Sequence, residues 1–302
     1  MRSLDFKHIL VPTDLTAESV VSLRYARFFA ERFASKITIL YVDPITFLGP
    51  EIAVTLPEDV VTTPAHLGKL QHDVRDWAGR ELDGLNFDIT ATLGPPAAMI
   101  VNEEKHAHAD LVVMATHGLH GWRRLILGSV TEGVLRAGLA PVLSVNRTEP
   151  GLKKAKPIHR ILCPVNFTDV ARQSLDYAAQ LAAAFDSELI VVHVVEQPDE
   201  LREAAGEIDI RAWIAPAIQD RCTYREIVMR GGASERVLDA AEDFEAGLIV
   251  IGAQHKRFRN ETVIGTTTER LVRFARVPVL SIPSPVATEV TAGAESELAN
   301  AL

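Results

Sequence analysis

The sequence is short of the residues and runs that mark several classes of protein. It has two cysteines, Cys163 and Cys222, among 302 residues, too few for a disulfide framework and without zinc-site spacing. No run approaches the roughly 18 apolar residues of a membrane helix, and the first residues lack the apolar stretch of a signal peptide. These absences favour a cytoplasmic chain with no membrane partner.

Positive charge is also scarce. Lys and Arg total 31 against 40 Asp and Glu, which gives a formal net charge of −9 at pH 7. An acidic surface repels the phosphate backbone of nucleic acid and anionic lipid heads, so neither is expected as the main partner. A bound nucleotide would therefore need a local device, such as a set of backbone N–H groups.

Two common catalytic loops are missing as well. The sequence holds neither Gly-x4-Gly-Lys-(Ser/Thr) nor Gly-x-Ser-x-Gly. Cys163 is expected to be a small core residue rather than a nucleophile. The histidines His106, His108, His117 and His120 lack the spacing of a metal site and are expected on the surface or in loops.

What the sequence does contain is an internal repeat. Ile9–Asp14 matches Ile161–Asn166, and this offset of 152 holds through the segment that follows. Further along, the offset is 137, as between Gly128 and Gly265, so the second copy is 15 residues shorter. A register held over whole segments indicates a duplication.

The repeat predicts the domain organisation. We expect a first domain over 1–147 and a second over 158–284, each of a size that one core can support. Residues 148–157 combine Pro, Gly and Lys without an apolar period, which is typical of a linker. The tail 285–302 is rich in Ala, Glu, Thr and Ser and is expected to be disordered.

Each copy alternates apolar strands with helices. In the first copy we expect strands at 8–11, 37–42, 87–92, 111–114 and 141–145, and helices at 19–33, 96–106 and 129–137. In the second copy we expect strands at 160–163, 189–194, 225–229, 248–251 and 278–282. This pattern predicts an α/β fold, with a five-stranded parallel sheet flanked by helices in each copy. Ligands of such sheets bind beyond the carboxyl ends of the strands.

In the first copy those strand ends carry polar and glycine-containing turns. Pro12-Thr13-Asp14 follows the first strand, Asp43 ends the second, and Ala115-x2-Gly118-x9-Gly128-Ser129 follows the fourth. A glycine before a helix lets an anion approach the backbone, and the helix N-terminus favours negative charge. The hydroxyls of Ser129 and Thr131 could add hydrogen bonds to phosphate.

These segments resemble the universal stress protein family, whose ATP-binding members carry Gly-x2-Gly-x9-Gly-(Ser/Thr) after the fourth strand. Ala115 replaces the first of these glycines, which should be tolerated if its φ is negative. The resemblance covers nearly the whole chain, twice over. It implies two tandem Rossmann-like domains of the adenine nucleotide alpha hydrolase-like type.

For the first copy the resemblance implies a site for ATP with Mg²⁺ or Mn²⁺. The backbone of Val42 would meet adenine, and Asp14 would bond the ribose or help to hold the metal. The rest of the site would be Pro12 and Thr13 at the base and sugar, Met114, Ala115 and Gly118 as one wall, and Gly128, Ser129, Val130 and Thr131 around the phosphates.

The second copy departs from this pattern. Asn166 replaces Asp14, Val195 replaces Asp43, and His255 stands where the motif has its second glycine. The positions that persist are Gly252, Gly265, Thr266 and Thr268, beside a loop that Lys256, Arg257 and Arg259 make basic. We expect this second site to be empty or altered.

The predicted function is a stress-response regulatory protein that binds ATP in its first domain. Without a P-loop lysine or an evident water-positioning base, the sequence favours binding over turnover. A slow ATPase and a nucleotide-free scaffold for a protein partner are the alternatives.

The resemblance also implies how the copies assemble. Members of the family pair through their last strands, so 142–145 and 279–282 are expected to dock within one chain, and two chains to form a homodimer. The apolar stretch 44–64 is long for a loop, and we expect it to contact the other copy or a second subunit.

Overall fold

The computed structural model describes residues 4–17, 19–44, 64–116, 127–146, 155–196, 210–214, 216–253, 255–258 and 261–284. Five strands and four helices form the first copy within these ranges. Its strands are β1 (His8–Thr13), β2 (Lys36–Asp43), β3 (Phe87–Leu93), β4 (Leu111–Ala115) and β5 (Val142–Val145). Its helices are α1 (Val20–Phe33), α3 (Pro64–Gly79), α4 (Pro96–His106) and α5 (Ser129–Ala137).

The second copy repeats this arrangement. Its sheet strands are β6 (Arg160–Val165), β7 (Glu188–Val195), β8 (Tyr224–Arg230), β9 (Leu248–Ala253) and β12 (Val279–Pro283). Its helices are α6 (Asp169–Phe185), α8 (Ile210–Trp213), α9 (Pro216–Gln219), α10 (Ala233–Asp243) and α11 (Thr266–Phe274). An antiparallel hairpin of β10 (His255–Phe258) and β11 (Glu261–Ile264) lies between β9 and α11.

The strands form one continuous ten-stranded sheet in the order β3-β2-β1-β4-β5-β12-β9-β6-β7-β8. Strands within each copy pair in parallel, as predicted. The copies join where β12 pairs antiparallel with β5, Leu280 opposite Leu143, so the expected docking through the last strands is confirmed. Because the junction is antiparallel, the carboxyl edges of the two copies lie at opposite ends of the sheet.

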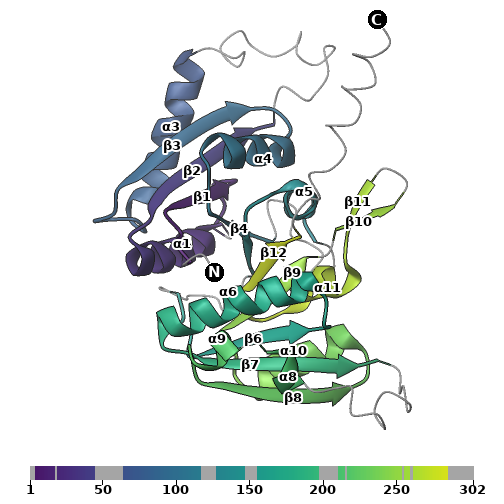
Figure 1. Ribbon diagram of the computed structural model, residues 1–302. Helices are drawn as coiled ribbons and strands as arrows, with labels where there is room; N and C mark the ends of the chain where they lie inside the picture. The colour runs from purple at the N-terminus through teal and green to yellow at the C-terminus, as the bar shows by residue number, and fades with distance from the viewer. Residues whose placement is uncertain are drawn as a thin grey trace, which may run out of the picture.

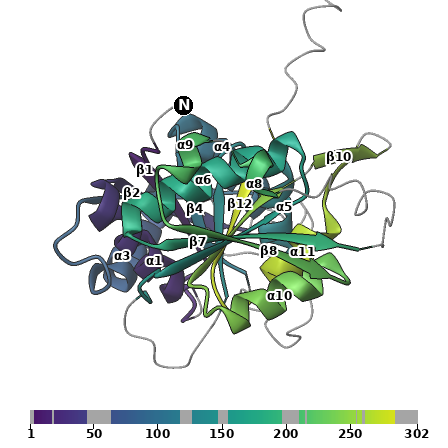
Figure 2. The same cartoon turned by 60° about the horizontal axis from the view of Figure 1, so that its bottom comes forward.

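Helices cover both faces of this sheet, and each face has one core that spans the two copies. Side chains of α1, α3, α6, α8 and α9 pack on one face, and side chains of α4, α5, α10 and α11 pack on the other. Figure 1 shows the first copy above the second, and Figure 2 shows α6 and α10 on opposite sides of β7 and β8. Burial on both faces explains the near-continuous apolar strands.

Aromatic rings join the copies on the first of these faces. Phe185, at the end of α6, stacks on Phe28 of α1 with ring centroids 5.1 Å apart, and its ring lies 5.3 Å from that of Phe29. Such pairs add to the burial of apolar area. The two copies therefore share a core as well as a sheet.

The duplication is visible in the backbone itself. Non-glycine residues with left-handed φ occur at matched positions of the repeat, and so do two glycines. The pairs are Leu15 (61°) with Phe167 (59°), Ala34 (53°) with Asp186 (54°), His108 (50°) with Glu245 (48°), and Gly94 (141°) with Gly231 (126°). Since few non-glycine residues adopt this conformation, the matches show that the turns were copied along with the elements.

The two copies differ where their first helices begin. In the second copy Thr168 caps α6 by accepting the N–H of Ala171 at 3.3 Å. In the first copy the equivalent Thr16 likewise accepts an N–H at 3.3 Å, from Ser19, and each threonine donates its hydroxyl to the residue two positions earlier, Asp14 at 2.6 Å and Asn166 at 2.7 Å. The difference is that α1 starts only at Val20, three residues later in the repeat than α6, and that the Ser19 hydroxyl also donates to Asp14.

Some elements were not predicted. Helix α3 follows the 44–64 stretch, and α8 and α9 take its place in the shorter second copy. The hairpin β10–β11 forms at the basic loop of the second copy. Residues 45–63, the 147–154 part of the linker and the 285–302 tail lie outside the described ranges, so the expectations for them stay predictions.

Candidate functional site

The strand order of the first copy has a reversal between β1 and β4. The chain runs from β1 outward to β2 and β3, then returns to β4 and β5 on the other side. The helix after β1 covers one face of the sheet, and the helix after β4 covers the other. Such a reversal opens a crevice at the carboxyl ends of the strands, where open α/β sheets bind their ligands.

The start of α5 forms one wall of this crevice. Gly128 is the N-cap, and its carbonyl accepts the first intrahelical bond, from Glu132 N–H at 2.9 Å. The N–H groups of Ser129, Val130 and Thr131 therefore precede the intrahelical ladder. Ser129 is exposed and Val130 half-buried. Aligned N–H groups at a helix start are suited to an anion.

Two hydrogen bonds hold this turn against the end of β4. The Gly128 N–H donates to the carbonyl of Thr116 at 3.2 Å, and Thr131 Oγ1 donates to the carbonyl of Ala115 at 3.2 Å. Thr131 is buried, with 2% of its surface exposed. Its hydroxyl thus serves the protein itself, contrary to the expectation that it would bond phosphate, and its backbone N–H is the group left for an anion.

Asp14 lies at the other wall, just after β1. Its Oδ1 accepts the Thr16 N–H at 3.1 Å, the Thr16 hydroxyl at 2.6 Å and the Ser19 hydroxyl. Because all three bonds use Oδ1, the carboxylate is fixed in orientation and Oδ2 is the oxygen that can serve a ligand. Leu15 turns the chain away from the sheet with φ of 61°.

The backbone of Val42 faces the same crevice. The carbonyl of Asp43 accepts Gly94 N–H at 3.0 Å and so points toward β3. Successive residues of a strand direct their backbone groups to opposite sides, so those of Val42 point toward β1. Leu15 N–H, which would continue that ladder, donates instead to Thr13 Oγ1 at 3.0 Å. The Val42 carbonyl thus lies where β1 leaves the sheet.

The β2 end of the crevice is acidic. Burial raises the pKa of Tyr41, and the negative charges of Asp43, Asp14 and Asp73 raise it further. Asp43 is only 3% exposed and lies 3.0 Å from His66 Nε2. His66 was not predicted as a site residue, because the helix α3 that carries it was not expected.

The predicted site residues are therefore brought together, apart from Gly118, which lies outside the described ranges. Pro12 and Thr13 are the last residues of β1, and Met114 and Ala115 are the last residues of β4. Ala115 is not among the residues with positive φ. Its methyl group is therefore tolerated, as expected.

In the second copy the first helix packs closely against the end of the fourth strand, β9. An ideal Cβ on Gly252, the counterpart of Ala115, would lie 2.5 Å from Val170 Cγ1 and 2.9 Å from the Val170 carbonyl oxygen. Val170 is in the first turn of α6, which begins three residues earlier in the repeat than α1. The start of α6 therefore lies directly against the end of β9. His255 begins β10, so its backbone is extended rather than left-handed.

The helix start after β9 nevertheless keeps its form. Gly265 is the N-cap of α11 with φ −61° and ψ 138°, close to the −60° and 135° of Gly128. Thr268 Oγ1 donates to the Gly252 carbonyl at 3.3 Å, as Thr131 does to Ala115. The backbone form of the helix start therefore does not distinguish the two sites.

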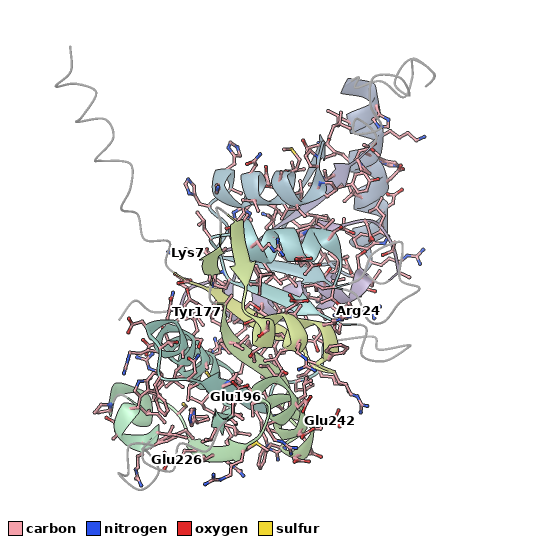
Figure 3. The ribbon with its side chains drawn as sticks, turned by 90° about the vertical axis from the view of Figure 1, so that its right-hand side faces the viewer. Lys7, Arg24, Tyr177, Glu196, Glu226 and Glu242 are labelled. Atoms are coloured by element: carbon pink, nitrogen blue, oxygen red, sulfur yellow. The ribbon has the colours of Figure 1, made fainter. Side chains whose placement is uncertain are left out.

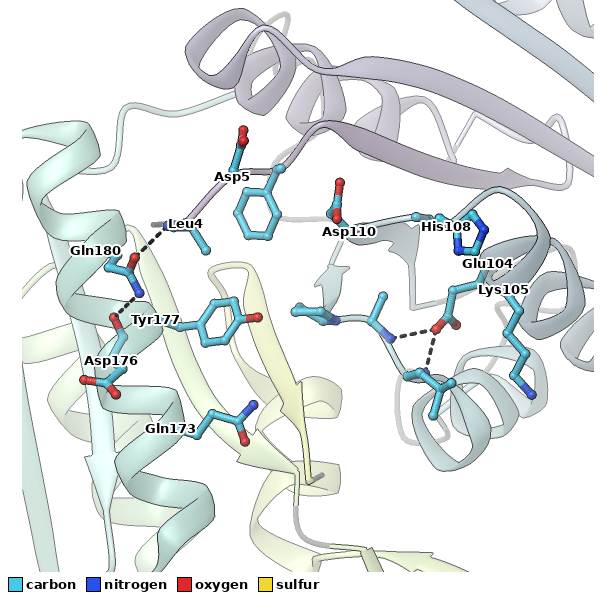
Figure 4. A pocket seen from close by; sticks show the side chains of 15 residues that line it. Leu4, Asp5, Glu104, Lys105, His108, Asp110, Gln173, Asp176, Tyr177 and Gln180 are labelled. Atoms are coloured by element: carbon cyan, nitrogen blue, oxygen red, sulfur yellow. Dashed lines mark hydrogen bonds between the residues drawn. The ribbon is translucent and has the colours of Figure 1, made fainter. Parts of the chain in front are cut away.

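A separate cavity of about 620 Å³ lies between the copies (Figure 4). Asp110 and Pro141, which line it, precede β4 and β5, so it opens at the amino edge of the first sheet, opposite the crevice. Tyr177 of α6 projects into it from the second copy, and Figure 3 places this residue at the junction. Glu104 also lines it, with Oε1 accepting the N–H groups of Leu139 and Ala140 at 2.6 Å each.

Cys163 is fully buried in the core, and burial raises the pKa of its thiol to about 12. Among described side chains, no three His, Cys, Asp or Glu form a group that could hold a metal ion. In the same part of the chain, no helix is long and apolar enough to span a bilayer.

Comparison with known proteins agrees with the fold. A universal stress protein of Mycolicibacterium smegmatis is 22% identical over 291 residues, which cover 91% of this chain and 96% of that one. A universal stress protein of Methanocaldococcus jannaschii is 29% identical over 147 residues, 47% of this chain and 83% of the relative. The solved structure of an Archaeoglobus fulgidus universal stress protein covers 93% of this chain and 99% of its own, with 21% identity and a TM-score of 0.66.

The sequence pattern of the family itself matches the chain twice. The universal stress protein pattern covers residues 5–146 and 157–283, one match for each copy. With both halves matched and a tandem relative aligned from end to end, the chain belongs to the universal stress protein family and carries two copies of its domain.

Proposed function

We propose that the first copy binds ATP in the crevice between β1 and β4, and that the protein is a nucleotide-dependent regulator of the stress response. The observation that carries this proposal is the start of α5. Its N–H groups at Ser129, Val130 and Thr131 precede the intrahelical ladder, and two bonds fix the turn to the end of β4. A preset row of donors meets the need for a local anion-binding device on an acidic chain.

Charge orients the nucleotide in this crevice. Asp14 and Asp43 lie at its β2 end, where they raise the pKa of Tyr41. Carboxylates repel a triphosphate and accept hydrogen bonds from ribose hydroxyls, whereas the α5 terminus favours phosphate. The ribose therefore lies at Asp14, the phosphates at α5, and the adenine amino group at the Val42 carbonyl.

The residues present suit a cation carried in with the nucleotide. Mg²⁺ is commonly held by substrate phosphates, waters and one or two carboxylates rather than by a full protein cage. Asp14 Oδ2 and the Ser129 hydroxyl are the protein groups that would serve such an ion, Mg²⁺ or Mn²⁺. When bound, the ion neutralises part of the phosphate charge.

Binding without rapid turnover fits the environment of Asp14. A general base needs a free lone pair within reach of the attacking water, yet Asp14 Oδ1 already accepts three hydrogen bonds. Its other oxygen, Oδ2, is the one proposed above for the ribose and the ion, so neither oxygen is left for an attacking water. We therefore favour a binding protein over an ATPase.

The direct test is the adenine nucleotide released per chain when the purified protein is denatured. About one ATP per chain is expected, and two would show that the second copy is competent. ADP would indicate hydrolysis. No nucleotide, even after incubation with Mg-ATP, would refute the proposal in favour of a scaffold that binds a protein partner.

A matched pair of variants locates the site. In Gly128→Val, the new Cβ would lie 3.0 Å from the Thr116 carbonyl and the side chain would enter the phosphate space, so binding should be lost. Gly265→Val makes the same change at the N-cap of α11 and should leave binding intact. Circular dichroism of both checks the fold, and retained affinity in Gly128→Val would exclude the site.

A further inference from the structure

Asn146 joins the two copies through its side chain. It follows β5 and is 9% exposed. Its Nδ2 donates to the carbonyl oxygens of Val272 at 3.0 Å and Ala275 at 2.7 Å. Both carbonyls belong to the end of α11, where the last turn of a helix leaves carbonyls without intrahelical donors. A side chain of the first copy thus completes a helix of the second.

The other end of the same amide reaches the nucleotide crevice. Asn146 Oδ1 accepts the hydroxyl of Thr116, which is 1% exposed. Because carbonyl oxygens only accept hydrogen bonds, the NH₂ group must face α11 and the oxygen must face Thr116. The orientation of the amide, and the role of the Thr116 hydroxyl as donor, are therefore set by chemistry.

Thr116 is also the residue that holds the turn before α5. Its N–H donates to Val145 at 3.2 Å, and its carbonyl accepts the Gly128 N–H at 3.2 Å. An unbroken path of hydrogen bonds runs from Gly128 through Thr116 and Asn146 to the end of α11. It joins the phosphate turn of one copy to a helix of the other.

The repeat offers no equivalent path in the opposite direction. The counterparts of Thr116 and Asn146 are Ala253 and Pro283, whose side chains have no hydrogen-bonding group. A contact needed only to hold two similar domains together could have been kept on both sides of the junction. This one is present only on the side of the copy with the proposed ATP site.

We propose that Asn146 is a positioning residue that couples nucleotide occupancy of the first copy to the order of α11 in the second. This inference rests on the proposed ATP site. A phosphate bound at the α5 start fixes the turn against Thr116, and with Thr116 fixed its hydroxyl holds Asn146 on the α11 carbonyls. Linkage requires the reverse as well, so loss of the contact weakens ATP binding.

Amide hydrogen exchange on the intact chain, with and without Mg-ATP, tests the coupling. In the wild type, ATP should slow exchange at residues 129–133 and also at 271–275. We expect about fivefold slowing at the second segment, the lower end of the usual range for coupled sites. In Asn146→Ala at saturating ATP, slowing at 129–133 should remain and slowing at 271–275 should vanish. The Kd for ATP should rise by about fivefold.

Three further variants separate coupling from packing. Thr116→Val removes the hydroxyl and should behave as Asn146→Ala, while Thr116→Ser keeps the hydroxyl and should behave as the wild type. Ser144→Ala is the matched control, because Ser144 is a buried residue of β5 at the same junction, opposite Val279. It should leave the coupling intact.

The outcomes distinguish the coupling from the site beneath it. Slowing at 129–133 without slowing at 271–275 in the wild type would overturn the coupling and leave the ATP site standing. Slowing at both segments that survives in Asn146→Ala would also overturn it. No slowing at either segment would overturn both proposals together.

Discussion

The duplication places the same threonine at the same point of each copy, which makes a matched pair of substitutions possible. Thr131 Oγ1 donates to the Ala115 carbonyl at 3.2 Å, and Thr268 Oγ1 donates to the Gly252 carbonyl at 3.3 Å. The two threonines are 2% and 3% exposed. Valine keeps the shape of the side chain and removes the hydroxyl, so each substitution takes a donor from one carbonyl.

The stability effects of Thr131→Val and Thr268→Val should be nearly equal. Leaving a buried polar group without its partner costs about 1–3 kcal/mol in the free energy of unfolding, and burial and distance are closely matched at the two sites. The effects on ATP should differ. Hydrogen bonds to charged groups contribute about 1.5–3 kcal/mol, so misaligning one phosphate contact at the α5 start should raise the Kd about tenfold or more.

Urea denaturation measures the first quantity, and calorimetric titration with Mg-ATP measures the second. Only Thr131→Val should bind ATP more weakly, with Thr268→Val as the control for stability loss alone. An equal loss of affinity in both variants would refute a site confined to the first copy. Unchanged affinity in a destabilised Thr131→Val would show that this bond does not position the turn.

Three further predictions follow from the second copy and the buried titratable groups. Asn166→Asp should leave one nucleotide per chain, because Val170 still lies against the end of β9; two released nucleotides would contradict this. At pH 8, iodoacetamide should label half-buried Cys222 far faster than Cys163, whose pKa of about 12 leaves almost no thiolate; equal labelling rates by mass spectrometry would contradict it. Burial raises the pKa of the Glu104 carboxyl above its ordinary value of 4.5 in the folded protein. Between the ordinary and the raised pKa, the folded form binds more protons than the unfolded form, so the free energy of unfolding falls as the pH rises. Glu104→Gln should flatten this slope in denaturation curves, and an unchanged slope would exclude the assignment.

Much of the fold could be predicted because the local apolar patterns of the sequence agree with the helices and strands that form. Helices α4 and α5 begin and end at the residues expected from the sequence, and the sheet strands agree within a few residues. β1 is the instructive case, since it continues through Pro12 to Thr13. Proline ended the expected strand because it lacks an N–H, yet Pro12 lies beyond Leu10, where the pairing of β1 with β4 ends, and it stays in register with Leu40 of β2.

The different starts of α1 and α6 are not explained by threonine capping. Thr16 and Thr168 each donate a hydroxyl to the residue two positions earlier, Asp14 at 2.6 Å and Asn166 at 2.7 Å. Each also accepts an N–H from three residues later, Ser19 and Ala171, at 3.3 Å in both copies. The capping preference of threonine is therefore met in both copies, although α6 starts three residues earlier in the repeat than α1.

The second copy also differs in how its first helix packs. α6 starts early enough for Val170 to lie in its first turn against Gly252. The exchange of the Asp14 carboxylate for Asn166 therefore coincides with close packing of the start of α6 on the end of β9. For this reason we expect that restoring the carboxylate alone would not restore a site in the second copy.

The antiparallel junction then limits how the copies can influence each other. It places their carboxyl edges at opposite ends of the sheet, so a ligand in the first crevice lies far from the corresponding edge of the second copy. Influence between them has to pass through the junction of β5 and β12 and the helices beside it. Asn146 lies at the end of β5 that reaches the first crevice, and there it contacts the last turn of α11. Because the junction keeps the two carboxyl edges apart, a side chain that contacts both the turn after β4 and the last turn of α11, as Asn146 does, is suited to couple the proposed ATP site to the second copy.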